Sequence, residues 1–182
     1  MNKINPRNIL IYLGVVPPIL TVVLAQWGKT DAFHMLVWQM LVVFGYAATV
    51  YDIREKRVPN QLIGFMMGAW ILSIVPQLFF QTEMTIRFLL RGVWGFLIGG
   101  LVFLVVYLVS RKGLGGGDVK LMAVSGLYLG IDGVLPAMLY GSVLAALTGI
   151  ILILIKKIGK NDAIALVPFL YVGMILTMVI VL

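Results

Sequence analysis

Long apolar runs separated by short polar loops constrain this chain more than any other feature. A helix needs about 20 apolar residues to cross a hydrocarbon core of roughly 30 Å. Seven stretches reach or approach that length: Ile9–Gln26, Phe33–Tyr51, Gln61–Phe80, Phe88–Val109, Val119–Ile131, Val134–Ile155 and Ala163–Leu182. Hydrophobic residues make up 62% of the chain and charged residues 12%, against about 45–50% and 25% in soluble domains. The sequence therefore predicts an all-α, polytopic membrane protein with about seven transmembrane helices, and it argues against a soluble enzyme or a nucleic-acid-binding domain.

The positions of the 14 basic residues predict how these helices are oriented. Loops rich in Lys and Arg stay on the cytoplasmic side of most membrane proteins. If the amino terminus is cytoplasmic, eleven basic residues lie inside: Lys3, Arg7, Arg54, Lys56, Arg57, Arg111, Lys112, Lys120, Lys156, Lys157 and Lys160. Only Lys29, Arg87 and Arg91 then lie outside. We therefore expect a cytoplasmic amino terminus and a carboxyl terminus outside, and this bias accounts for the net charge of +7 without nucleic acid.

The fifth predicted helix, Val119–Ile131, is short for a membrane span. Thirteen residues at 1.5 Å each cover about 20 Å. Either this helix tilts through a thinned bilayer, or the glycine run before it dips into a recess lined by protein. No linker or internal repeat divides the chain, so we expect a single transmembrane domain over 1–182, with an extra helix in 1–32 and a core in 33–182. The first helix ends like a signal peptide but is expected to remain uncleaved.

Two of the seven acidic residues call for a special explanation. Asp52 closes an apolar stretch, and Asp118 opens another directly after Gly115-Gly116-Gly117. Both fall on the predicted cytoplasmic side at a similar depth. Two carboxylates held close together in a low-dielectric recess share a proton, so that one can activate a water while the other polarises a carbonyl. On spacing alone, the alternative that each merely ends or caps a helix stays open.

Metal chemistry has little support in the composition. The chain has no cysteine and a single histidine, His34. Thiolate sites, histidine clusters and a catalytic cysteine are thereby excluded. We expect neither a metal nor another cofactor.

Three motifs stand in order along the chain. The first is Asp52 followed, after five residues, by Val58-Pro59-Asn60. The second is Gly115-Gly116-Gly117-Asp118-Val119-Lys120-Leu121, whose aspartate lies 66 residues after Asp52 (118 − 52). The third is Val167-Pro168-Phe169-Leu170-Tyr171-Val172-Gly173. Together they resemble the type IV prepilin and preflagellin peptidases, a family of GxGD membrane aspartyl proteases, and the similarity extends from Tyr46 to the carboxyl end.

This resemblance implies a function, a site and a location. It implies a multi-pass protein of a prokaryotic plasma (inner) membrane that removes a basic leader from prepilin-like or preflagellin-like substrates at the cytoplasmic face. The cut would follow a glycine and precede the substrate's hydrophobic helix. Asp52 and Asp118 would be the catalytic pair, and the bilayer and the substrate the partners. Other matched positions would shape loops or place substrate: Pro59, Asn60, Gly115, Gly117, Lys120, Pro168 and Phe169.

One feature of the longer family members is missing from this sequence. Those members carry a cytoplasmic region with paired cysteines and also methylate the new amino terminus. This chain has no cysteine, and only Trp27–Ala32 joins its first two predicted spans. We therefore expect peptidase activity without methyl transfer.

Two other functions remain as alternatives. Intramembrane proteases of the presenilin and signal-peptide-peptidase kind share GxGD, but their aspartates lie well inside long spans. They also use a Pro-Ala-Leu motif where this chain has Val167-Pro168-Phe169. An ion-coupled transporter could bind a cation between two aspartates, but no repeat relates the halves of this chain.

Overall fold

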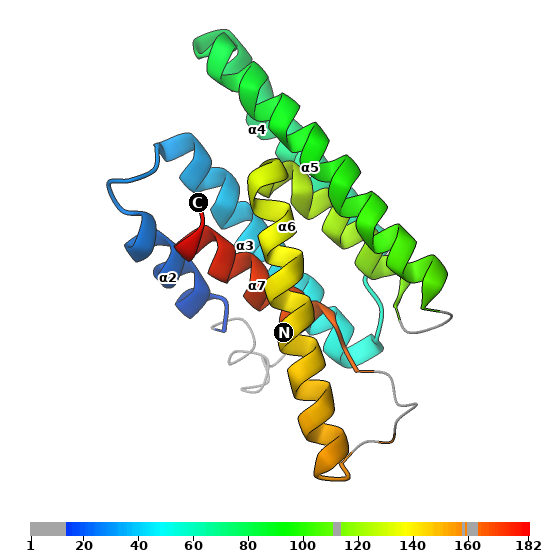
Figure 1. Ribbon diagram of the computed structural model, residues 1–182. Helices are drawn as coiled ribbons and strands as arrows, with labels where there is room; N and C mark the ends of the chain where they lie inside the picture. The colour runs from blue at the N-terminus through cyan, green and yellow to red at the C-terminus, as the bar shows by residue number, and fades with distance from the viewer. Residues whose placement is uncertain (1–13, 111–113, 158, 160–163) are drawn as a thin grey trace, which may run out of the picture.

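The computed structural model describes residues 14–110, 114–157, 159 and 164–182, and the secondary structure within those ranges is entirely helical (Figure 1). The helices are α2 (Val16–Gln26), α3 (Ala32–Glu55), α4 (Asn60–Phe80), α5 (Thr82–Val109), α6 (Gly116–Leu154) and α7 (Val167–Ile180). Four of these, α3 to α6, are long and apolar enough to cross a membrane, while α2 and α7 have 11 and 14 residues. The prediction of an all-α membrane protein is confirmed, but the count of seven spans is not supported.

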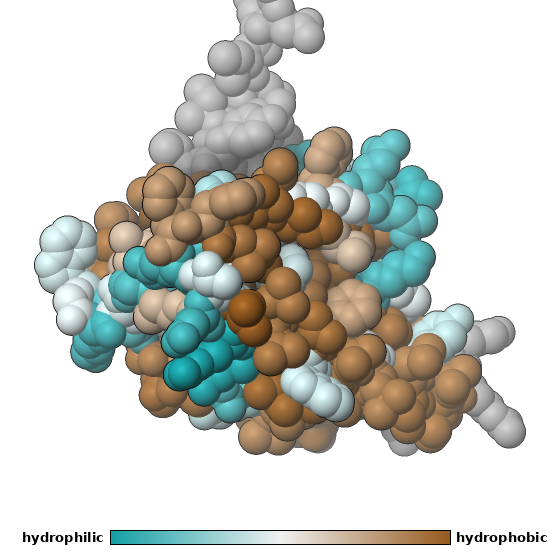
Figure 2. Space-filling model, turned by 90° about the horizontal axis from the view of Figure 1, so that it is seen from above, coloured by the Kyte–Doolittle hydropathy of each residue, from teal (hydrophilic) through white to brown (hydrophobic). Residues whose placement is uncertain are grey.

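The surface of the molecule is largely apolar. Figure 2 shows a face on which hydrophobic residues predominate and hydrophilic residues gather in separate patches. Large side chains such as Leu24, Phe79 and Phe80 are among the most exposed. Water would penalise so much exposed apolar surface, whereas lipid does not. The surface therefore agrees with the membrane character predicted from composition.

The boundaries of α6 differ most from the sequence prediction. Val119–Ile131 and Val134–Ile155 were expected as separate helices, but a single element runs from Gly116 to Leu154. The element bends at Gly130, whose φ of 68° and ψ of −178° are not helical. A positive φ favours glycine because it has no Cβ. The chain therefore turns at one residue rather than through a loop, and Figure 1 shows two limbs of α6 diverging from this bend.

Close backbone contact joins α5 to the first limb of α6. Gly95 and Gly126 face each other so closely that a Cβ on either would overlap the backbone of the other helix. Gly92 and Gly99 meet the carbonyl oxygens of Leu127 and Met122 in the same way. Small residues permit this approach in membranes, where dispersion contacts rather than water exclusion hold helices together. The first limb of α6 is thereby fixed against α5.

One hydrogen bond links α4 to this pair of helices, and another links α2 to α7. The Tyr128 hydroxyl of α6 donates to the Met66 carbonyl of α4 at 2.6 Å. The Gln26 side-chain amide of α2 donates to the Met178 carbonyl of α7. In addition, α7 packs between α3 and α6. The end of α3, the start of α6 and the start of α7 are thus held at one end of the molecule.

Only part of the first predicted span lies among the described residues, and the last helix is shorter than expected. The first span was predicted as Ile9–Gln26, and its described part begins as α2 at Val16 with prolines in the first helical positions. The last was predicted as Ala163–Leu182, but α7 begins only at Val167. Proline suits the first turn of a helix because its missing N–H has no helical partner there. Outside the described residues lie the start of the first span and the basic residues Lys3, Arg7, Arg111, Lys112 and Lys160.

Candidate active site

A recess of about 380 Å³ lies where α3 ends and where α6 and α7 begin. It is lined by Asp52, by residues 56–58 of the α3–α4 connection, by the glycine segment 114–118, and by residues 164–166 before α7. Both aspartates singled out from the sequence therefore line one cavity, although 66 positions separate them in the chain.

Asp52 occupies the last turn of α3 and is only 6% exposed. Its Oδ2 accepts a hydrogen bond of 3.0 Å from the backbone N–H of Val167, the first residue of α7. The amino terminus of a helix carries partial positive charge, which favours a carboxylate there. Lys56 ends α3 in a left-handed conformation (φ 51°) and donates its N–H to the Asp52 carbonyl at 2.8 Å. The chain can thus turn away directly after the aspartate.

Asp118 is the third residue of α6 and is 8% exposed. Its Oδ2 accepts a hydrogen bond of 3.0 Å from the backbone N–H of Gly115. In return, the Asp118 N–H donates to the Gly115 carbonyl at 3.1 Å. The side chain therefore folds back over the first turn of its own helix, and both this bond and the helix terminus favour its charged form.

The two carboxyl groups share an unusual environment. Each is almost fully buried, and each accepts a hydrogen bond from a backbone N–H that holds its orientation. Both side chains line the same recess. Two buried carboxyls that line one recess can divide the roles of base and proton donor. Within the described part of the chain, no group of three or more His, Cys, Asp or Glu residues could hold a metal ion.

The three glycines before Asp118 have different surroundings. A Cβ on Gly117 would lie 3.2 Å from both the backbone nitrogen and the Cβ of Val58. A Cβ on Gly115 would lie 3.2 Å from the Asp118 carboxylate. Gly116, in contrast, has no heavy atom within 4 Å of that position. Gly117 therefore allows the close approach of the first two motifs, Gly115 leaves room for the Asp118 carboxylate over its own helix turn, and Gly116 has room for a side chain.

One side-chain hydrogen bond connects the first two motifs at the edge of the recess. Lys120 Nζ donates to Asn60 Oδ1 at 2.9 Å and so joins the first turn of α6 to the first residue of α4. Pro59 precedes α4 in an extended conformation with ψ of 136°. These three residues lie beside the recess and not in its wall.

Pro168 and Phe169 also stand outside the wall of the recess. They belong to the first turn of α7, where the Phe169 N–H donates to the Leu166 carbonyl at 3.0 Å. This turn places the Val167 N–H against Asp52. The third motif therefore contacts Asp52 through the backbone.

Several groups near the recess were not found from the sequence. The Val167 N–H is a backbone donor, and no residue pattern identifies such a donor. Thr49 and Tyr171 lie one turn from Asp52 and Val167, and their buried hydroxyls have no hydrogen-bond partner among the described residues. A polar residue within an apolar span can indicate a functional group. Such residues are too common in this chain for that pattern to single out Thr49 or Tyr171.

Residues 38–150, more than half of the chain, match the type IV leader peptidase family. The chain is 27% identical over 150 residues to a protein of Bacillus subtilis (strain 168) named prepilin leader peptidase/N-methyltransferase, covering 80% of this chain and 55% of that relative. A protein of the same name from Xanthomonas campestris pv. campestris is 28% identical, and the match covers 74% of this chain and 46% of that relative. Another from Aeromonas hydrophila is 26% identical, and the match covers 81% of this chain and 48% of that relative. The chain thus spans about half the length of the curated relatives it matches. No solved structure matches it.

Proposed function

We propose, from the premise that this chain belongs to the type IV leader peptidase family, that it is a membrane aspartic endopeptidase. Its substrates are proteins of the prepilin or preflagellin type, from which it removes a basic leader ahead of a hydrophobic helix. The observation that carries the proposal is the convergence of Asp52 and Asp118, both nearly buried, in one recess. Both also stand at helix ends rather than at mid-span, which favours this activity over an intramembrane protease.

The chemistry needs one ionised and one protonated carboxyl group. The ionised carboxylate takes a proton from water as the water oxygen bonds to the scissile carbonyl carbon, while the protonated group donates to the carbonyl oxygen. As the C–N bond of the tetrahedral diol breaks, the newly protonated carboxyl gives its proton to the leaving nitrogen. The other carboxylate takes a proton from a diol hydroxyl, which restores the starting pair. The backbone N–H groups of Val167 and Gly115 hold the pair in place throughout.

The division of charged residues between the two ends supports the proposed orientation. Lys56 and Arg57 line the recess, and Arg54 and Lys120 stand on the helices beside it. In a second cavity at the other end, the acids Asp31 and Asp132 offset the basic Lys29 and Arg91. If the two limbs of α6 are counted separately, the described helices form seven segments. Each segment runs from one end of the molecule toward the other, in the direction opposite to the segment before it. We place the recess on the cytoplasmic side of a prokaryotic plasma membrane, with the carboxyl terminus outside, because basic loops favour that side.

Cysteine labelling tests this orientation in a background without cysteine. A cysteine at Lys56 should react with impermeant maleimide only from the cytoplasmic side, and one at Asp132 only from outside. Labelling of Lys56→Cys from outside would place the recess on the wrong face and contradict the proposed substrate.

We further propose that this chain, as a single domain, cleaves without methylating. The α3–α4 connection has only four residues, 56–59, and three of them line the recess. A pocket for a methyl-donating cofactor would need more polar chain than that. Mass spectrometry of a substrate processed with S-adenosylmethionine should show leader loss without an added methyl, and a methyl that depends on this chain alone would refute the proposal.

A cleavage assay tests the central proposal. The purified protein is incubated with a polypeptide that has a Lys/Arg-rich leader, a glycine before the scissile bond and an apolar helix. The expected products are the leader and the intact helix, cut after the glycine. Intact substrate after long incubation, together with cation flux in liposomes, would favour a transporter instead.

A further inference from the structure

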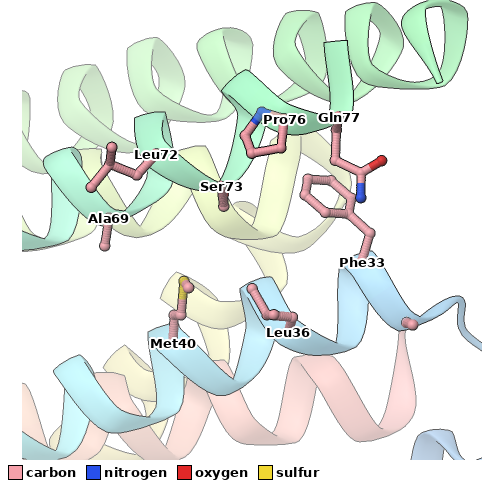
Figure 3. A pocket seen from close by; sticks show the side chains of 9 residues that line it. Phe33, Leu36, Met40, Ala69, Leu72, Ser73, Pro76 and Gln77 are labelled. Carbon is pink, nitrogen blue, oxygen red and sulfur yellow. The ribbon is translucent and has the colours of Figure 1, made fainter. Parts of the chain in front are cut away.

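A groove opens between α3 and α4 on the apolar surface, with a volume of about 550 Å³. Figure 3 shows Leu36 and Met40 of α3 pointing toward α4, whose Ala69, Ser73 and Pro76 form the opposite wall. The groove occupies the half of these two helices farther from the recess. Its walls belong to candidate membrane spans, so it faces the interior of the bilayer.

The α3 wall of the groove leads back to the recess. Phe33, Leu36 and Met40 line the groove at spacings of three and four residues, which places them on one face of the helix. The same face continues through Ala47 to Tyr51, an exposed side chain one residue before the aspartate of α3. The connection 56–58 also lines the recess and joins α3 to α4 at the inner end of the groove.

The α4 wall can receive another helix. Phe65, Gly68, Leu72 and Pro76 follow one another at spacings of three and four residues and so share a face. Phe65 and Leu72 are exposed, and a Cβ on Gly68 would meet no heavy atom within 4 Å. A glycine between large apolar residues lets a second helix approach closely.

Polar groups at the outer end of the groove distinguish a helix from a lipid chain as its occupant. The Gln77 amide lines the groove beside Phe33 (Figure 3), and no hydrogen bond among the described residues involves this side chain. Pro76 has no N–H to donate to the Leu72 carbonyl one turn earlier. An acyl chain has no partner for these groups, whereas a helix can bring a polar side chain to them.

We propose that this groove binds the apolar helix of the substrate whose leader is cleaved in the recess, an inference that rests on the proposed function. Met40 lies 12 residues before Asp52 and Phe33 lies 19 before it, or about 18 Å and 28 Å along the helix axis. A substrate helix that starts at the level of the aspartates therefore reaches the groove with its residues about 12 to 19 beyond the scissile bond.

Disulfide cross-linking tests the placement, because the chain has no cysteine of its own. The enzyme carries Asp52→Asn to retain the substrate and a single cysteine at Leu36. The substrate is the leader–helix polypeptide described above, with single cysteines scanned along its helix. Cross-links should peak between residues about 12 and 19 with a period of three to four. A cysteine at Leu97 of α5 is the matched control, since Leu36 and Leu97 are 49% and 51% exposed.

The other occupants give different results. Equal cross-linking from Leu36 and Leu97, or none from Leu36, would overturn the inference and leave lipid as the occupant. A disulfide between two enzyme chains through Leu36 in the absence of substrate would assign the groove to a second copy, and would equally overturn it.

Kinetic measurements distinguish an effect on helix binding in the groove from an effect on catalysis in the recess. Leu36→Trp fills the groove and should raise KM for the leader–helix polypeptide about tenfold, while Leu97→Trp leaves it unchanged. Cleavage of a short peptide that ends six residues after the scissile bond should be the same in both variants, which also reports correct folding. An unchanged KM in Leu36→Trp would refute the groove alone, whereas failure of the unaltered enzyme on both substrates would refute the proposed function.

Discussion

The two ends of this molecule each gather acidic residues around a cavity, but they hold them differently. At the recess, Asp52 and Asp118 are nearly buried and accept hydrogen bonds from backbone N–H groups. At the other end, a cavity of about 250 Å³ includes Asp31 and Asp132. There Asp31 contacts His34 at 2.5 Å, and Asp132 pairs at 3.6 Å with an arginine of α5.

The difference supports the proposal that the two acids of the recess perform the chemistry. An exposed carboxylate is already solvated by water, and its contact with another exposed side chain contributes little to stability. A buried carboxylate held by the backbone keeps its position while its proton can leave or return. This contrast supports the proposal that proton transfer takes place in the recess, whereas the acids of the opposite cavity join helices at the other end of the molecule.

The largest expected effect is the loss of cleavage when an acid of the recess, but not an acid of the opposite cavity, is replaced. Asp52→Asn or Asp118→Asn should each lower leader cleavage by at least about 100-fold, because an amide cannot serve as base or proton donor. Expression and membrane insertion should stay near normal, since the amide oxygen can still accept the backbone N–H. Cleavage is followed by gel shift, with Asp132→Asn as the exposed control. More than a few per cent of activity in either recess variant would contradict the two-carboxylate mechanism.

The second prediction concerns the glycine segment. Gly117→Ala should reduce kcat/KM by about tenfold, because the added methyl would press on Val58 and shift the aspartate. Gly116→Ala should stay within twofold, since nothing lies within 4 Å of its Cβ position. Steady-state kinetics on both variants measure this contrast. Equal losses would mean that the segment acts through flexibility rather than through close packing.

The third prediction concerns the hydrogen bond between the first two motifs. Lys120→Met and Asn60→Ala should each lower kcat/KM about fivefold, as expected for loss of roughly 1 kcal/mol. The double variant should lose little more than either single one, because both remove the same bond. Additive losses in this double-mutant cycle would show that the two residues act separately.

The smallest effect is expected at the opposite end. Arg91 and Asp132 side chains are 70% and 57% exposed, so Arg91→Gln should change the unfolding free energy by no more than about 1 kcal/mol. Leader cleavage should remain within twofold. Thermal unfolding in detergent and the cleavage assay give both values. A large loss of activity would show that the outer cavity is coupled to the recess.

Side-chain patterns made much of this architecture predictable. Apolar runs of about 20 residues located α3 and α4 closely, because the bilayer requires that length and tolerates few charges. The same logic failed for α6, since hydropathy reports the limbs but not how they connect. Only the backbone angles of Gly130 show that one residue makes the turn.

The sequence by itself determined that this is a helical membrane protein with two aspartates at comparable depth, because length, hydropathy and charge are properties of residues in order. The tertiary structure decided that these aspartates share a recess, that the Val167 N–H holds one of them, and that α3 and α4 leave a groove in the half of these helices farther from the recess. Each of these depends on how distant backbones approach. That approach is set by packing, such as the glycine contacts between α5 and α6, and packing couples residues that no local pattern connects.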